Sequence, residues 1–252
     1  MSKVIAVTNQ KGGVGKTTTS FHVVHGASEA LIETKSSELV LAIDLCGQGN
    51  LSQFLTGNLE INKNPGGAEK LFDREDGEEL PFMETLLPNV KLLHGHRDLP
   101  LLDTDETLEK AVELREAIRN LPFAYIIIDT PPALGPRIAA PMLWADAAYI
   151  IVEAHLSSVT GLDDTFDTVE LVKGINSDLE VKMVLNRYVK SASFSKQFRT
   201  ALMERFGSML VEEFALRTAV SDACQNFRPV WKHAKDKALK EQWREFVMRA
   251  IA

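Results

Sequence analysis

The sequence predicts an α/β protein with a doubly wound, mostly parallel β-sheet and helices on both faces. Apolar runs of strand length recur along the 252 residues, helical patterns alternate with them, and no Pro/Ser-rich linker or internal repeat divides the chain. Alternation of strand and helix is typical of layered α/β proteins. We therefore expect one domain that spans residues 1–252.

The expected strands are short apolar runs, several of them continuous, as in strands buried on both faces of a parallel sheet. They are Val4–Thr8, Leu39–Asp44, Val90–Leu93, Tyr125–Asp129, Ala148–Val152 and Val181–Leu185, with Met209–Phe214 as a weaker seventh. Helical spacing predicts a helix from Thr17 to about Thr34, one capped by Asp103 with Glu106 three residues on, and others before Gly174 and Gly207. Residues 57–88 are expected to form a surface excursion with one or two short helices, in which the acidic cluster at 73–79 is a solvated turn.

The composition is ordinary for a soluble globular protein, with 45% apolar and 25% charged residues. No apolar run reaches the ~18 residues that indicate a membrane-spanning helix. The first strand begins so close to the N-terminus that it leaves no room for a signal peptide. Cys46 and Cys224 match neither a metal-ligand spacing nor a disulfide framework. These features favour a cytoplasmic protein.

A phosphate-binding loop is predicted between the first strand and the first helix, at Thr8–Thr19. Glycines let successive backbone N–H groups point at phosphate oxygens, and the new helix adds the positive end of its dipole. Lys16 is placed to reach the terminal phosphates, and the Thr17 hydroxyl to bind Mg²⁺. The loop departs from the common motif because position 10 is Gln and a second lysine, Lys11, lies inside it.

This variant, KGGVGKTT with two lysines, resembles the deviant Walker A motif of the ParA/MinD ATPases. The resemblance covers nearly the whole chain and implies a small ParA/Soj-type ATPase that uses ATP/ADP and Mg²⁺. It also implies an ATP-dependent homodimer, in which Lys11 crosses the interface to the partner's phosphates. The residues that would bind the nucleotide are Lys11, Gly12, Gly13, Val14, Gly15, Lys16, Thr17 and Thr18.

Two strands end in a carboxylate, at the edge where open α/β sheets bind ligands. Asp129 ends an apolar strand that resembles the family's Walker B element, and we expect it to hold Mg²⁺ through water. The Thr-Pro-Pro that follows resembles the family's switch region. Asp44 matches the first Asp of the family's Asp-x-Asp-Pro-Gln-Gly-Asn stretch and is expected near the Mg²⁺ shell, as a catalytic residue beside Lys11 and Lys16.

The second Asp of that stretch, which orients the attacking water in family members, is Cys46 in this chain. A thiol is a poor substitute for a carboxylate in such a role, so hydrolysis is expected to be slow or to depend on a partner. The alternative is that another group positions the water. After a later strand, Asn186 matches the family's adenine-reading Asn, and an amide suits an adenine edge. Its alternative role is a simple strand-end turn.

The charge is uneven along the chain. Residues 181–252 contain 14 Lys/Arg against 7 Asp/Glu, although the whole chain has a net charge of −7. By resemblance to the partition branch of the family, this part of the chain is expected to bind DNA without sequence preference. The candidate residues are Arg217, as the best single choice, with Lys196, Arg199, Lys235, Lys237 and Lys240. The alternative is that these side chains only solvate the terminal helices.

The final helix has an apolar stripe that includes Leu239, Trp243 and Phe246. Packing on the sheet is favoured over a membrane-surface role like that of the MinD branch. The family resemblance implies a nucleoid-associated ATPase that segregates a plasmid or chromosome, or positions another cargo, with a ParB-like activating partner. Two alternatives stay open: a MinD-like membrane-cycling ATPase, and a nucleotide switch that hardly hydrolyses ATP.

Overall fold

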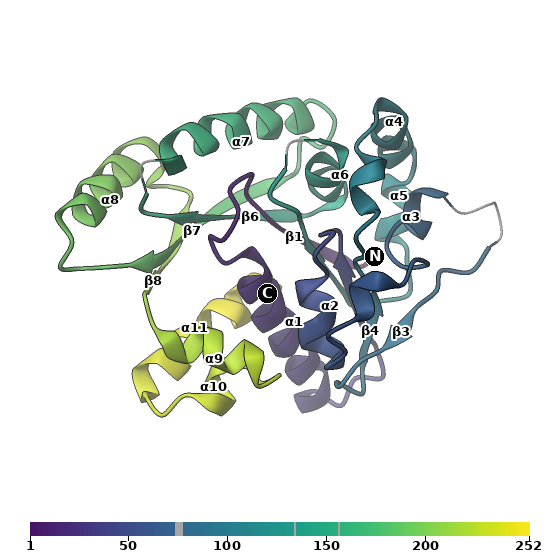
Figure 1. Ribbon diagram of the computed structural model, residues 1–252, viewed down its shortest axis with the longest axis horizontal. Coiled ribbons are helices and arrows are strands. Elements are labelled where there is room, and N and C mark those ends of the chain that lie inside the picture. The colour runs from purple at the N-terminus through teal and green to yellow at the C-terminus, as the bar shows by residue number, and fades with distance from the viewer. Residues whose placement is uncertain (74–77, 134, 156) are drawn as a thin grey trace.

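The computed structural model describes residues 1–73, 78–133, 135–155 and 157–252. Part of the predicted acidic turn (74–77) and Leu134 of the predicted switch stretch lie outside the described residues. Within the described part, an eight-stranded sheet has the order β3-β4-β2-β5-β1-β6-β7-β8 (Figure 1). The strands are β1 Lys3–Thr8, β2 Val40–Asp44, β3 Met83–Glu84, β4 Val90–Leu93, β5 Tyr125–Asp129, β6 Ala147–Glu153, β7 Glu180–Tyr188 and β8 Leu210–Ala215.

All neighbouring strands are parallel except β3 and β4, which confirms the predicted fold class. The seven predicted strands are present within three residues of their predicted bounds. The sequence did not predict β3, a two-residue antiparallel strand in the excursion at 57–88. Its Met83 pairs with Leu92 of β4, a contact that local apolar patterning does not encode.

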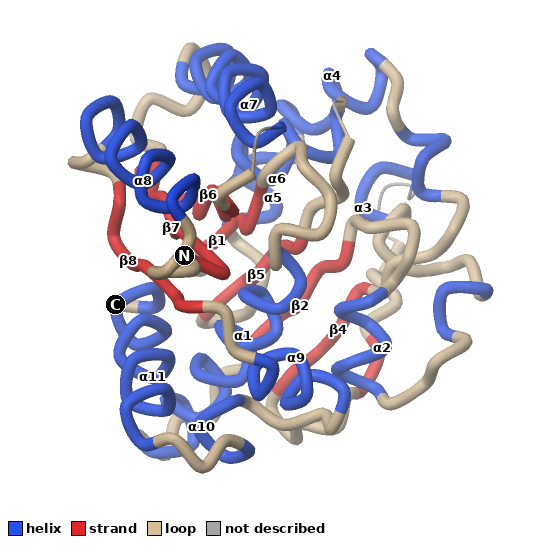
Figure 2. Tube along the Cα trace, turned by 60° about the vertical axis from the view of Figure 1, so that its left-hand side comes forward, coloured by secondary structure: helices blue, strands red, loops and turns tan. Residues whose placement is uncertain are grey.

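Helices cover both faces of the sheet, and successive residues of the strands point to opposite faces. In β1, Val4 and Ala6 pack on one face and Ile5 and Val7 on the other, all fully buried, which explains the continuous apolar run. The first face carries α3 Lys70–Asp73, η2 Leu99–Leu102, α4 Asp105–Glu113, α5 Arg115–Arg119, α6 Pro136–Trp144, α7 Ser157–Lys173 and α8 Ser193–Phe206. The second carries α1 Lys16–Glu33, α2 Asn50–Thr56, η1 Ile61–Lys63, α9 Thr218–Gln225, α10 Val230–His233 and α11 Lys237–Ile251. Figure 2 shows the strands between α7 and α8 on one side and α10 and α11 on the other.

The cap predicted at Asp103 is wrong by one residue. Thr104 is the N-cap of α4, where its hydroxyl accepts a hydrogen bond from the backbone N–H of Thr107 at 3.3 Å. The Asp103 carboxylate instead binds the guanidinium of Arg137, at 2.6 and 3.0 Å. A charged partner 34 positions away therefore outcompetes the local cap.

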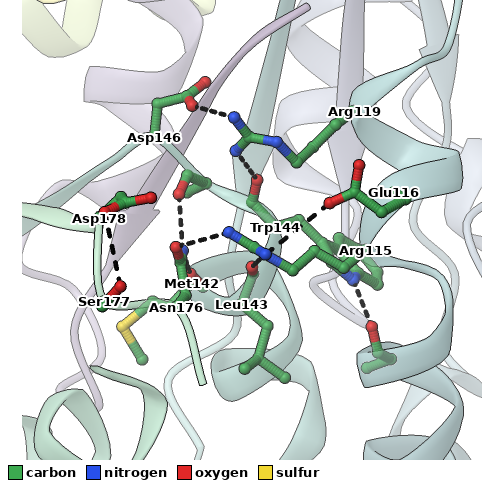
Figure 3. Close-up of polar contacts among 12 residues, drawn as sticks. Arg115, Glu116, Arg119, Met142, Leu143, Trp144, Asp146, Asn176, Ser177 and Asp178 are labelled. Carbon is green, nitrogen blue, oxygen red and sulfur yellow. Dashed lines mark hydrogen bonds and ion pairs between the residues drawn. The ribbon is translucent and has the colours of Figure 1, made fainter. Parts of the chain in front are cut away.

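The C-terminal carbonyls of α6 have no partners within that helix, and side chains from neighbouring segments satisfy them (Figure 3). The donors are Asn176 to Met142 O and Ala145 O, both at 2.9 Å, Arg115 to Leu143 O at 3.1 Å and Arg119 to Trp144 O at 3.1 Å. Arg119 also binds Asp146 at 2.6 Å, and Asp146 accepts from the N–H of Val4 at 2.8 Å. This network fixes the amino-terminal edge of the sheet, opposite the loop after β1.

Candidate nucleotide-binding site

The loop between β1 and α1 has a backbone that favours glycine at two positions. Gly13 has φ +78° and Gly15, the N-cap residue of α1, has φ +103°. A Cβ at Gly15 would also lie 2.3 Å from Nδ2 of Asn186. Both the conformation and the space therefore require glycine at position 15.

Side chains at the start of the loop anchor it to β6 and α7. The amide of Asn9 donates to Ile151 O at 2.7 Å, and its oxygen accepts from the N–H of Lys11 at 2.8 Å. Gln10, which departs from the common motif, donates to Asp164 O at 2.9 Å and to the Thr168 hydroxyl at 3.1 Å. Gln10 thus binds the loop to α7 where the common motif has glycine.

Two consecutive residues at the end of β7 hold the middle of the loop. Asn186 donates from Nδ2 to Val14 O at 2.8 Å, and Arg187 donates from Nη1 to Gly13 O at 2.6 Å. Arg187 has φ +54°, a strained value for a residue with a side chain. Asn186, predicted as the adenine reader, therefore lies beside the loop with its amide nitrogen already engaged. The sequence did not identify Arg187 as part of the site.

The loop forms one wall of a cavity of about 230 Å³. Segments after β2 and β5 form the facing wall. The lining residues are Gly12, Gly13, Gly15, Lys16, Thr17, Thr18, Cys46, Gln48, Asn50, Phe54, Thr130 and Pro132. Six of the predicted nucleotide-binding residues thus line one cavity: Gly12, Gly13, Gly15, Lys16, Thr17 and Thr18. The side chain of Val14 is buried in the core behind them, and Lys11 is not among the lining residues.

Lys16 is buried, with 6% of its surface exposed, and its ammonium donates to Lys11 O at 2.9 Å. Burial lowers its pKa, an effect that the nearby carboxylate of Asp129 opposes. Burial also lowers the pKa of Lys11, and the carboxylate of Glu153 opposes that shift. Both lysines therefore lie where an anion would stabilise their charged form.

Thr17 and Asp129, two of the predicted metal ligands, are in direct contact. The Thr17 hydroxyl donates to one carboxylate oxygen of Asp129 at 2.7 Å, and the Ser20 hydroxyl donates to the other at 2.8 Å. Burial and the neighbouring Asp44 raise the pKa of Asp129 to about 7. The sequence did not single out Ser20, although it lies one turn after Thr17 on the same helix.

Asp44, the third predicted metal ligand, is fully buried and braces the segment that follows β2. Its carboxylate accepts from the N–H of Cys46 at 3.0 Å, the N–H of Ser52 at 2.9 Å and the Ser52 hydroxyl at 2.8 Å. These bonds favour the charged form, but burial raises the pKa of Asp44 more strongly. Asp44 therefore fixes α2 and the segment that carries Cys46 against the sheet.

Cys46 lies in the cavity wall with 8% of its surface exposed. Burial and the carboxylate of Asp44 raise the pKa of its thiol to about 11. The thiol is therefore neutral at pH 7 and does not act as a base. A neutral group, rather than a carboxylate, occupies this position of the cavity.

The C-terminal helices pack against the same helix that begins at the loop. His22 of α1 binds Thr18 O through Nδ1 at 2.7 Å and accepts from the N–H of Val230 through Nε2 at 3.1 Å. Complete burial lowers the pKa of His22 to about 4. The apolar stripe of α11 is buried against α1, so the predicted packing role is confirmed. Its buried members are Leu239, Trp243, Phe246, Val247, Ala250 and Ile251.

The predicted DNA-binding residues lie on elements from both faces of the sheet. Lys196 and Arg199 belong to α8 on one face of the sheet, whereas Lys237 and Lys240 belong to α11 on the other. Arg199 forms two hydrogen bonds with Glu213, at 2.6 and 2.7 Å, and Lys237 lies 3.6 Å from Glu241. Within the described residues, the side chains of Lys196, Lys235 and Lys240 have no ion-pair partner, and neither does Arg217, which follows β8.

Comparison with known proteins identifies relatives that match most of the chain. The AAA domain family model matches residues 2–181. The chain is 32% identical over 241 residues to the chromosome partitioning protein ParA of Caulobacter vibrioides, covering 90% of this chain and 86% of that protein. It is 33% identical over 193 residues to the sporulation initiation inhibitor protein Soj of Bacillus subtilis, covering 73% and 72%. A solved complex of a Cyanothece McdA variant with ATP has a TM-score of 0.81 at 23% identity, covering 99% of this chain and 96% of that one.

Within the part of the chain that the structure describes, no helix combines the length and the apolar character that crossing a bilayer requires.

Proposed function

Because the chain belongs to the ParA/MinD family of partition ATPases, we propose that it is a dimerising ATPase switch that binds DNA without sequence preference and segregates or positions a cargo. The loop after β1 is the observation that carries the proposal. It presents Lys16 to a cavity of about 230 Å³ and holds Lys11 in the same turn. Such a loop at the carboxyl edge of a parallel sheet is built for nucleotide phosphates.

In this proposal the phosphates of ATP or ADP lie against the backbone N–H groups of residues 12–18, and Lys16 exchanges the carbonyl of Lys11 for phosphate oxygens. Oxygen donors suit Mg²⁺, and Thr17 and Asp129 present them side by side. Among the described residues, no three His, Cys, Asp or Glu side chains cluster as a metal site, so a bound Mg²⁺ would need phosphate oxygens and water as its further ligands. A divalent cation there would also favour the charged form of Asp129. Bound Mg²⁺ would neutralise charge on the phosphates.

Asn186 is proposed as the adenine reader. Its amide nitrogen is held by Val14 O, which leaves the amide oxygen to accept a hydrogen bond from the adenine amino group. Asp44 is proposed to act near the metal through the segment that it braces rather than as a free base. Its three hydrogen bonds support this role.

We propose that hydrolysis is slow without a partner. The neutral thiol of Cys46 stands where family members have a water-orienting Asp, and a general base at such a position is typically worth about 10²–10⁴-fold in rate. The same observation favours the second candidate, a nucleotide switch that hardly hydrolyses ATP. A membrane-cycling role is disfavoured because the apolar stripe of α11 lies in the core.

Dimerisation and DNA binding complete the proposal. Lys11 reaches the partner subunit's phosphates in an ATP-bound homodimer, and a ParB-like protein stimulates turnover on the nucleoid. Arg217, Lys196, Lys235 and Lys240 are the stronger candidates for phosphate contacts, because ion pairs already engage Arg199 and Lys237. Contacts of this kind weaken steeply with salt.

The proposal is tested by binding to a random-sequence DNA duplex with ATP, with ADP and without nucleotide, at two salt concentrations. Lys16→Ala is the matched variant, because its side chain belongs to the nucleotide loop and not to the proposed DNA contacts. Salt-sensitive binding that requires ATP and disappears in the variant supports the proposal. Equal binding in all three nucleotide states refutes the switch, and no binding in any state refutes the DNA-binding role.

A further inference from the structure

One buried side chain joins the two segments that face the P-loop across the cavity. Arg137 lies in the first turn of α6, directly after the segment that follows β5, and only 3% of its surface is exposed. Its Nη1 donates to Leu45 O at 3.1 Å. Its Nε and Nη2 donate to the two carboxylate oxygens of Asp103, at 3.0 and 2.6 Å.

Each partner of Arg137 belongs to a different segment. Leu45 directly precedes Cys46 in the cavity wall, and its N–H donates to Asp129 O at 3.0 Å. Thr130 and Pro132, on the segment that leads to Arg137, line the same cavity. Asp103 lies between η2 and α4, which both pack on the first face of the sheet. The guanidinium therefore connects both nucleotide-facing segments with η2 and α4.

The geometry requires arginine. Three donors of one planar guanidinium bind a carboxylate in bidentate fashion and a carbonyl at the same time, which a lysine ammonium cannot reproduce. The close approach also depends on Gly135, which has φ +136° and whose added Cβ would lie 3.1 Å from Oδ1 of Asp103. The chain thus places a glycine where the carboxylate approaches the start of α6.

We infer that Arg137 is a positioning residue that holds the nucleotide-facing segments after β2 and β5 in a fixed relation, and that through Asp103 it couples the nucleotide site to residues 99–113. The inference rests on the proposed function, since it requires a nucleotide in the cavity. Buried charge-assisted hydrogen bonds are either made or broken and stretch little. A small displacement of the segments at the nucleotide site is therefore passed on to the rigid elements that these bonds hold.

The test is hydrogen–deuterium exchange of the full chain with and without Mg-ADP and with Mg and a non-hydrolysable ATP analogue. Two peptide regions are read, the loop at 9–20 and the segment at 99–113. In the wild-type chain we expect nucleotide to slow exchange at least about threefold in both regions. In Arg137→Met and Asp103→Asn, nucleotide should still slow exchange in the loop at 9–20 but should no longer slow it at residues 99–113.

The matched control is Arg119→Met. Arg119 makes the same kind of arginine–aspartate–carbonyl contact with Asp146 and Trp144 O, but at the opposite edge of the sheet (Figure 3). Its loss should leave the nucleotide response of 99–113 intact. Arg137→Lys keeps the charge without the bidentate geometry and should behave like Arg137→Met.

Steady-state kinetics supply a second readout. The Arg137 and Asp103 variants should lower kcat at least about fivefold and change the KM for ATP less than about twofold, because the phosphate loop itself is untouched. The kcat of the double variant Arg137→Met with Asp103→Asn should lie within about twofold of that of Arg137→Met alone, because both substitutions break the same contact.

A wild-type response confined to 9–20, or variants that keep the response at 99–113, would overturn the inference while the proposed function stands. If Arg137→Met fails to fold, Asp103→Asn decides the question, because the Asp103 side chain is partly exposed. No nucleotide protection at 9–20 in the wild-type chain would overturn both the inference and the proposed function.

Discussion

Replacing Cys46 by aspartate should accelerate ATP turnover and destabilise the nucleotide-free protein at the same time. Under the proposed function, the substitution supplies a carboxylate that can orient the attacking water. It also places a negative charge near two buried carboxylates, those of Asp44 and Asp129, which are paired on the neighbouring strands β2 and β5. Both carboxylates disfavour a charge on Cys46.

The size of the stability cost follows from the thiol. Its pKa is raised from 9.0 to about 11 by burial and by Asp44. At about 1.36 kcal/mol per pKa unit, this environment opposes a negative charge by about 3 kcal/mol. A carboxylate there should meet a similar opposition, so its folded-state pKa rises above the unfolded value. The cost is therefore absent at pH values below both and grows as pH rises from the unfolded-state pKa to the folded-state pKa.

We expect Cys46→Asp to lower the free energy of unfolding by about 3 kcal/mol at about pH 8 and by little at about pH 4. Turnover at saturating Mg-ATP should rise by at least about tenfold, toward the roughly 10²–10⁴-fold typical of a general base. Denaturant unfolding and phosphate release measure the two effects on the same sample. The neutral variants Cys46→Asn and Cys46→Ser serve as controls for size and polarity.

Two results would refute this reasoning. Turnover of Cys46→Asp within about threefold of wild type would show that another group positions the water. Equal acceleration by Cys46→Asn would show that polarity rather than a carboxylate limits the rate.

Three further predictions test other parts of the site. Gly15→Ala forces a side chain into φ +103° and against Asn186, so affinity for Mg-ADP by calorimetry should fall about ten- to hundredfold; a change under about twofold would contradict it. His22 should make the folded state lose about 3 kcal/mol as pH falls from 6.5 to 4, because the unfolded chain takes up a proton that the buried ring, with a pKa of about 4, refuses. Urea unfolding of His22→Gln should show a flatter pH profile. Arg217→Ala should reduce the slope of log binding constant against log salt concentration by about one, the loss of one phosphate contact. Arg199→Ala should leave that slope unchanged, because the Arg199 side chain is already paired with Glu213.

The central strands and the phosphate loop were predictable because their signals are local. In Tyr125–Asp129 the apolar run is continuous because both faces are buried, and its bounds were predicted without error. The glycine spacing of the loop likewise reports its own backbone conformation. Strand β3 was missed because two residues gain their structure only by pairing with β4.

The contacts that brace the site were not predictable for a related reason. Arg137 lies 92 positions from the Leu45 carbonyl that it binds, and Arg187 lies 174 positions from Gly13. No pattern within a window of the sequence relates such pairs. Asp103 shows the consequence, since its spacing to Glu106 indicates a cap that a remote arginine displaces.

The order of the strands has a consequence for synthesis of the chain. Strand β1, Lys3–Thr8, is synthesised before the other seven strands of the described sheet, yet it lies in the middle of that sheet between β5 and β6. Its backbone therefore has no ladder partner until about residue 125 has been made, and its second partner follows only after residue 147. At about 5–20 residues per second, an apolar strand waits several seconds with exposed hydrogen-bonding edges. Exposed apolar strand edges of this kind are prone to aggregation. A strand from the centre of the finished sheet is therefore unprotected for much of the chain's synthesis.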